Sequence, residues 1–104
     1  MTNAKNILSL AIASIDTSNP ENFKWATAGA GINGRPALAD MVAAVAYQTI
    51  ADALIDTHLT SREQRAIRDE IKQLVIENAH AFNPSSYLMK NEIAAIKKIV
   101  LANI

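Results

Sequence analysis

The residues from 37 to 58, ALADMVAAVAYQTIADALIDTH, have the apolar spacing of a long α-helix, with Pro36 at its start. The polar side chains of this segment form only a narrow row, made of Asp40, Gln48 and Asp52. A helix that is apolar around most of its circumference lies at the centre of a fold or is covered by another chain. We therefore predict a helical bundle built around this segment. Its predicted buried side consists of Leu38, Ala39, Met41, Val42, Ala43, Val45, Ala46, Tyr47, Ile50, Ala53 and Leu54.

Three further stretches, residues 3–16, 61–82 and 84–103, have apolar residues on one helical face and polar residues elsewhere. Each is predicted to be an amphipathic helix that packs its apolar face against the central segment. The predicted buried faces are Ile7, Leu8, Ala11 and Ile15 in the first, Ile67, Ile71, Leu74, Val75 and Phe82 in the second, and Met89, Ile93, Ile96, Val100 and Ile104 in the third.

Local signals mark where two of these helices begin. Thr60 and Glu63 have the spacing of a capping box, and Asn83-Pro84 pairs a good N-cap residue with proline at the first helical position. The links before both helices are very short. We therefore expect the last three long helices to pack as antiparallel neighbours.

The segment from Gly29 to Pro36, GAGINGRP, differs from the rest because it contains all 3 glycines of the chain. Glycine clusters mark unusual backbone angles or a close approach to another group. Ahead of it, residues 20–28 are predicted to form a short helix, since Asn19 and Pro20 suit its start and Gly29 suits its end. The alternative is a strand over these residues with both aromatic side chains on one face.

Together these elements predict an all-α fold. It is a compact bundle of four main helices, with a short extra helix and a Gly-rich loop between the first and the second. Residues 1–104 are expected to form a single helical domain, because chains of this length fold around one core.

The composition excludes several classes of protein. The 10 basic and 10 acidic residues cancel, whereas proteins that coat nucleic acid usually have a basic excess. The absence of cysteine removes disulfides and thiolate chemistry, and it fits a cytoplasmic protein. The chain has no uninterrupted run of about 18 apolar residues, so no membrane span is predicted. The N-terminal residues are predicted to be an amphipathic helix rather than a signal peptide.

The glycines of residues 29–34 match the pattern G-x-G-x-x-G. In dinucleotide-binding folds this pattern follows a parallel strand, and no such strand is predicted here. A weaker interpretation stays open. The loop leads into a helix N-terminus, and Lys24, Asn33 and Arg35 lie nearby in the sequence, so the loop could hold a small ligand, an anion or a nucleotide.

No catalytic or cofactor site is predicted. Glu77 and His80 have the Glu-x-x-His spacing of di-iron bundles, but such a site needs two of these motifs and two further inward-facing glutamates. No pattern brings a nucleophile, a base and an orienting acid together. We therefore expect a protein that is not an enzyme and that requires neither a metal nor a cofactor.

Residues 59–64, LTSREQ, resemble the opening of the first DNA-binding helix in regulators of the LuxR type. The resemblance covers about ten residues, and no glycine turn or short recognition helix follows. A basic strip of Arg65, Arg68 and Lys72 lies just beyond it, with acidic neighbours. The resemblance implies a DNA-binding regulator, and this is kept as a further alternative, although the charge balance disfavours nucleic acid as a partner.

Ile76 and Leu101 lie off the predicted core faces of their helices, which indicates an interface on a chain without net charge. We expect a small non-catalytic interaction protein, a regulator, inhibitor or adaptor, that binds another protein and forms a homo-oligomer through these two residues. Aromatic residues beside a loop are common recognition anchors. The predicted partner- or ligand-binding residues are Phe23, Lys24, Trp25, Gly31, Ile32, Asn33 and Arg35.

Overall fold

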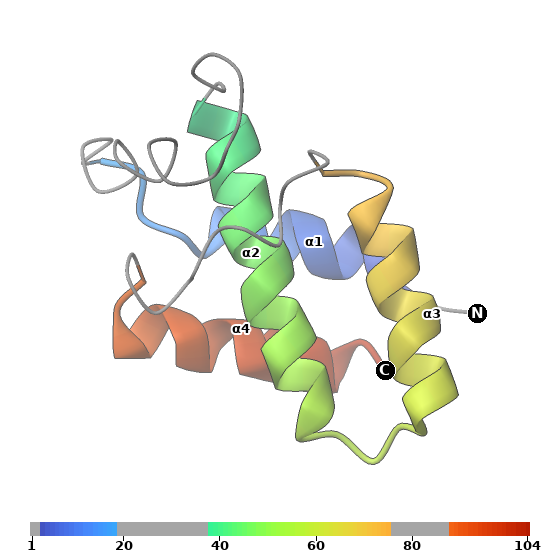
Figure 1. Ribbon diagram of the computed structural model, residues 1–104. Helices are drawn as coiled ribbons and strands as arrows, with labels where there is room; N and C mark the ends of the chain where they lie inside the picture. Colours follow the sequence, from blue (N-terminus) through green and yellow to red (C-terminus); the bar gives the residue numbers. More distant parts are fainter. Residues whose placement is uncertain (1–2, 19–37, 76–87) are drawn as a thin grey trace.

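The computed structural model describes residues 3–18, 38–75 and 88–104 (Figure 1). These residues form four helices, which are α1 (Ala4–Ala13), α2 (Leu38–Ile55), α3 (Ser61–Lys72) and α4 (Lys90–Ala102). The described part of the chain contains no strand, so the predicted all-α class is confirmed for it. None of its helices is both long and apolar enough to cross a membrane. The predicted short helix over residues 20–28 and the Gly-rich loop lie outside the described residues.

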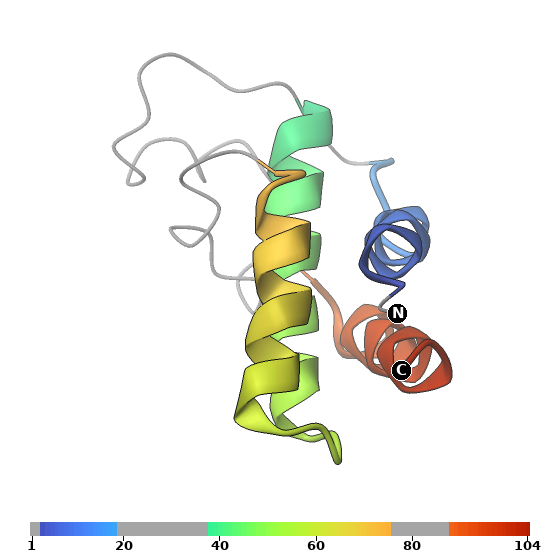
Figure 2. The ribbon, with the colours of Figure 1, turned by 90° about the vertical axis from the view of Figure 1, so that its right-hand side faces the viewer.

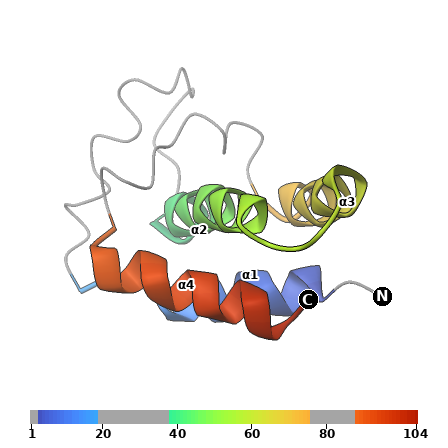
Figure 3. The ribbon, with the colours of Figure 1, turned by 90° about the horizontal axis from the view of Figure 1, so that it is seen from below.

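The helices form two layers. Figures 1 and 2 show α2 and α3 as an antiparallel hairpin that lies across a second antiparallel pair, α1 and α4. Figure 3 shows the two layers edge-on, with the α2–α3 hairpin in the upper part of the picture and the α1–α4 pair beneath it. The radius of gyration of the Cα atoms is 13.0 Å, which is typical of a compact domain of this length.

Helix α2 is the centre of the fold, as its sequence predicts. It packs against all three other helices. Ala44 and Ala46 are completely buried, and their small side chains let the neighbouring helices approach α2 closely. The prediction was wrong for Ala39, which is exposed, while Ala43 and Tyr47 are only half-buried.

Among the described residues, one polar side chain is fully enclosed in this core. Thr49 is buried, and its hydroxyl donates a hydrogen bond of 2.9 Å to the carbonyl oxygen of Val45 one turn earlier. A buried hydroxyl needs such a partner, since an unpaired one costs free energy. At the end of the helix, the Thr57 hydroxyl donates a bond of 2.6 Å to the carbonyl of Leu54 in the same way.

Helix α1 buries the predicted face against the other three helices. Its buried side chains are Ala4, Ile7, Leu8 and Ala11, and Ile15 is buried just beyond its end. Two hydrogen bonds tie the helix to α4. The side-chain amide of Asn6 donates to Asn103 Oδ1 at 2.9 Å, and the Asp16 N–H donates to Glu92 Oε2 at 2.7 Å. These bonds lie near opposite ends of the antiparallel pair and hold it in register.

Helix α3 begins as predicted but ends early. The capping box is complete, because Glu63 N–H donates to the Thr60 hydroxyl at 3.2 Å and Thr60 N–H donates to Glu63 Oε1 at 3.0 Å. The prediction that the helix extends to residue 82 was wrong for residues 73–75, since α3 ends at Lys72, and residues 76–82 lie outside the described residues. Ile71 is its last buried residue and Leu74 is 51% exposed, so packing no longer supports the helix there.

Helix α4 begins at Lys90, so the prediction of a helix from residue 84 was wrong for residues 88 and 89. Ile96 and Val100 are buried as expected, but Met89, which precedes the helix, is 69% exposed. The Glu92 carboxylate caps the start of the helix, because its Oε1 accepts a hydrogen bond of 2.8 Å from the Met89 N–H.

The expectation that the last three long helices pack as antiparallel neighbours was only half right. Helices α2 and α3 do so, joined by residues 56–60. Helix α4 instead crosses α2, pairs with α1, and makes only minor contact with α3. Between the end of α3 at Lys72 and the start of α4 at Lys90, residues 76–87 lie outside the described part of the chain.

Candidate functional site

The predicted loop site lies outside the described residues, together with one of the two self-interface residues. This applies to Phe23, Lys24, Trp25, Gly31, Ile32, Asn33, Arg35 and Ile76. The Glu77–His80 pair lies there as well. The roles of these residues therefore stay predictions, and the surface of the described residues is the place to look for further sites.

Leu101 is the one predicted site residue that the structure describes. It lies in the last turn of α4, and 58% of it is exposed. The sequence predicts that this side chain points away from the core, and the structure agrees. Lys97 lies one turn earlier on the same side of the helix and is also exposed.

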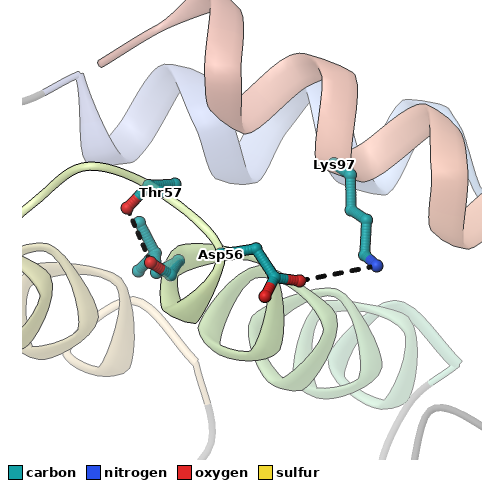
Figure 4. Close-up of polar contacts among 4 residues, drawn as sticks. Asp56, Thr57 and Lys97 are labelled. Atoms are coloured by element: carbon teal, nitrogen blue, oxygen red, sulfur yellow. Dashed lines mark hydrogen bonds and ion pairs between the residues drawn. The ribbon is translucent and has the colours of Figure 1, made fainter.

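An ion pair connects this side of α4 to the end of α2. The Lys97 Nζ atom lies 3.8 Å from Asp56 Oδ2, as Figure 4 shows. Ile55 directly precedes Asp56 and is 67% exposed. Two exposed aliphatic residues are therefore close in sequence to the ion pair, because Ile55 directly precedes Asp56 and Leu101 follows Lys97 by one helical turn. We call Ile55, Asp56, Lys97 and Leu101 the α2–α4 patch.

The two sides of the α2–α4 patch carry opposite charge. Between residues 38 and 60 the chain has acidic residues, among them the exposed Asp52 and Asp56, and no lysine or arginine. Helix α4 contributes the exposed Lys97 and Lys98. Its acidic residue, Glu92, is already bonded by two backbone N–H groups. The α2 side of the patch is therefore acidic and the α4 side basic.

A second feature is a cleft of about 490 Å³ where α1 and α3 begin and α4 ends. This volume is within the range of small-molecule sites, which is roughly 300–1,000 Å³. Both polar and apolar residues line the cleft, and they are Asn3, His58, Leu59, Glu63, Ala66, Ile67, Ala102, Asn103 and Ile104.

The polar groups of this cleft serve mainly to hold helix ends. The Thr60 backbone N–H and then its hydroxyl lower the pKa of Glu63, and the nearby His58 lowers it further. Asn103 uses its amide oxygen to accept from Asn6, and its amide N–H donates to the Ile99 carbonyl at 2.8 Å. These groups are committed to the fold. The cleft therefore offers less for ligand recognition than its volume implies.

Metal chemistry has no visible site in residues 3–18, 38–75 and 88–104. No group of three or more histidine, aspartate or glutamate side chains in these ranges is arranged to hold a metal ion. His58 and Glu63 are neighbours at the cleft, but both are exposed, and the carboxylate is bonded by its own capping box. No nucleophile joins them in the cleft.

The sequence reasoning missed Ile55 and Asp56 as surface residues of interest. Asp52 and Asp56 are four residues apart and so share one side of the α2 segment. Lys97 and Lys98 are adjacent basic residues on the last helix. These spacings were visible in the sequence. However, only the crossing of α4 over α2 shows that the two positions meet.

No protein-family model matches this chain, and no curated protein or solved structure is similar to it.

Proposed function

We propose that this protein is a small non-catalytic interaction protein that works by binding another macromolecule, as a regulator, inhibitor or adaptor, and that it self-associates. The observation that carries the proposal is the α2–α4 patch, where an ion pair joins two helices and an exposed aliphatic residue is close in sequence to each of its members. A single exposed leucine is ordinary on a protein surface. Exposed apolar residues next to both members of an ion pair between helices are what we propose as a contact surface.

Other features support the same proposal. Large apolar side chains are also exposed elsewhere in the described residues, among them Leu10, Leu74 and Met89. The formal net charge is +0, so little long-range repulsion opposes the approach of a second copy. A cytoplasmic location, predicted from the lack of cysteine, is part of the proposal.

We propose that the predicted loop residues bind a partner other than a second copy of the chain, which is either another protein or a small ligand. Trp25 and Arg35 distinguish the two main readings of this loop. If the loop binds a protein, Trp25→Ala should weaken capture of that protein. If it instead binds a small ligand or anion, Arg35→Ala should weaken ligand binding while self-association persists.

The DNA-binding alternative receives little support from α3. Helix α3 packs antiparallel to α2. Its basic residues alternate with the acidic residues Glu63, Asp69 and Glu70, so it has no uniformly basic face for DNA. A salt-sensitive mobility shift with duplex DNA at low ionic strength would revive this alternative.

The direct test of the proposal is the mass of the protein in solution, measured by light scattering coupled to size exclusion. A dimer or larger assembly supports self-association. A monomer at every concentration contradicts it, and leaves only the binding of a different macromolecule.

A further inference from the structure

We propose that the α2–α4 patch is occupied by a second copy of this chain, in a two-fold dimer in which the acidic end of α2 in each copy faces the basic side of α4 in the other. This inference rests on the self-association in the proposed function. It adds the surface, the symmetry and the charge pairing.

The charge pattern is what selects a second copy over an unrelated partner. In a two-fold interface the same surface of both copies meets, so it must be complementary to itself. The patch meets this condition, because Asp56 and the nearby Asp52 lie on one side while Lys97 and Lys98 lie on the other. A rotation by half a turn places each acidic side against the basic side of the other copy.

The ion pair between Asp56 and Lys97 within one chain is weak, so both side chains can also pair with the opposite charges of a second copy. Its N–O distance is 3.8 Å, and the Lys97 and Asp56 side chains are 49% and 72% exposed. Ion pairs with this exposure contribute little to stability, since water screens them. Covering them with a second copy would remove part of that water and strengthen the pairs between the copies.

The aliphatic residues supply the attraction that charge alone does not. Ile55 is 67% and Leu101 is 58% exposed; the first directly precedes Asp56, and the second lies one helical turn after Lys97. Burial of such side chains is the main favourable term in most protein association. Because the patch as defined has only two of them, we expect a dimer that dissociates at low protein concentration rather than an obligate one.

The first experiment reverses one charge at a time and then mixes the variants. Asp56→Lys makes the patch uniformly basic, and Lys97→Asp makes it uniformly acidic. Each variant alone should lose the dimer, because like charges then face each other. An equimolar mixture should restore a dimer that contains one copy of each variant. Native mass spectrometry identifies this mixed species, since the two variants differ in mass.

The mixing result also separates a failed interface from a failed fold. Both single variants break the same ion pair within a chain, so any damage to folding persists in the mixture. Recovery of the mixed dimer can come only from contacts between copies. If the variants stay dimeric alone, or if the mixture forms no mixed dimer, the proposed pairing is wrong.

The second experiment tests the aliphatic residues. Leu101→Asp and Ile55→Asp should each weaken the dimer by about tenfold or more, measured by sedimentation at several concentrations. Leu74→Asp is the matched control, because Leu74 is 51% exposed but lies at the end of α3, outside the patch. Circular dichroism verifies that each variant stays helical.

The outcomes distinguish this inference from the proposed function. An assembly that survives both patch substitutions overturns the inference, while self-association through another surface still stands. A monomeric wild type from micromolar to millimolar concentration overturns the inference and self-association together. In that case the binding of a different macromolecule is what is left of the proposed function.

Discussion

The carboxylate of Glu92 accepts a hydrogen bond of 2.7 Å from the backbone N–H of Asp16, 76 residues earlier in the chain. Its other oxygen accepts from the backbone N–H of Met89 at 2.8 Å. One side chain therefore fixes the start of α4 and, at the same time, holds the chain that leaves α1.

Replacement of Glu92 by alanine should lower the free energy of unfolding by about 1–3 kcal/mol, because two backbone N–H groups lose their acceptors. Urea unfolding followed by circular dichroism measures this change. Asn91→Ala is the control, since Asn91 is an exposed neighbour in the same turn. Equal stability of the two variants would show that the bonds of Glu92 contribute nothing.

The capping box of α3 gives a second prediction. Thr60→Ala removes the hydroxyl that accepts from the Glu63 N–H, and should cost about 1 kcal/mol. Thr60→Ser keeps this hydroxyl and should lie close to the wild type. The midpoint of thermal unfolding measures both variants. A Thr60→Ser variant as unstable as Thr60→Ala would instead point to the lost methyl group.

The third prediction concerns pH. The pKa of Glu63 lies below its ordinary value of 4.5, first because the Thr60 backbone N–H and hydroxyl bond its carboxylate, and then because His58 is near. The unfolded chain therefore takes up this proton at higher pH than the folded chain does. The stabilisation is complete above the unfolded pKa and is lost as the pH falls through the folded pKa.

Glu63→Gln isolates this contribution, because glutamine does not titrate. The stability difference between wild type and Glu63→Gln should shrink as the pH is lowered from neutral to below about 4. Urea midpoints at a series of pH values give the comparison. Asp16 also has a lowered pKa, due to the Ser18 hydroxyl and backbone N–H, but it is present in both proteins and cancels. A difference that is constant with pH would contradict the prediction.

Much of the fold is predictable from local patterns. The near-continuous apolar surface of residues 38–55 predicts the central position of α2, and the Thr60–Glu63 spacing predicts where α3 begins. The end of α3 is not predictable in this way, because it has no glycine or proline signal and depends on packing. The start of α4 is not predictable either, because the local signal at Asn83-Pro84 does not mark Lys90, where α4 begins. Leu74 has the right spacing for the core yet remains exposed.

The candidate site is less predictable than the fold. The exposure of Leu101 follows from helical spacing, but the contact of its helix with the end of α2 does not. That contact depends on α4 crossing α2, and the ion pair between Asp56 and Lys97 shows it. A sequence pattern locates faces on single helices, whereas a surface made of two helices needs their relative placement.

The fourth prediction tests the close packing around α2. Ala46→Leu should destabilise the protein by about 1–3 kcal/mol, because Ala46 is completely buried and the larger side chain must displace its neighbours. Ala66→Leu is the control, since Ala66 is exposed on α3. Urea unfolding compares the two. A tolerated leucine at position 46 would mean that the helices around α2 are spaced more widely than the structure shows.

The bond from Asn6 to Asn103 joins residues that are 97 positions apart. This has a consequence for the speed of folding. The α2–α3 hairpin is local and can form early, whereas the α1–α4 layer closes only after almost the whole chain has been drawn into a loop, at an entropic cost. Folding rates fall as the mean sequence separation of contacts rises. We therefore expect this helical protein to fold more slowly than a bundle of equal size whose helices pack in chain order, with the closing of α1 on α4 as the late step.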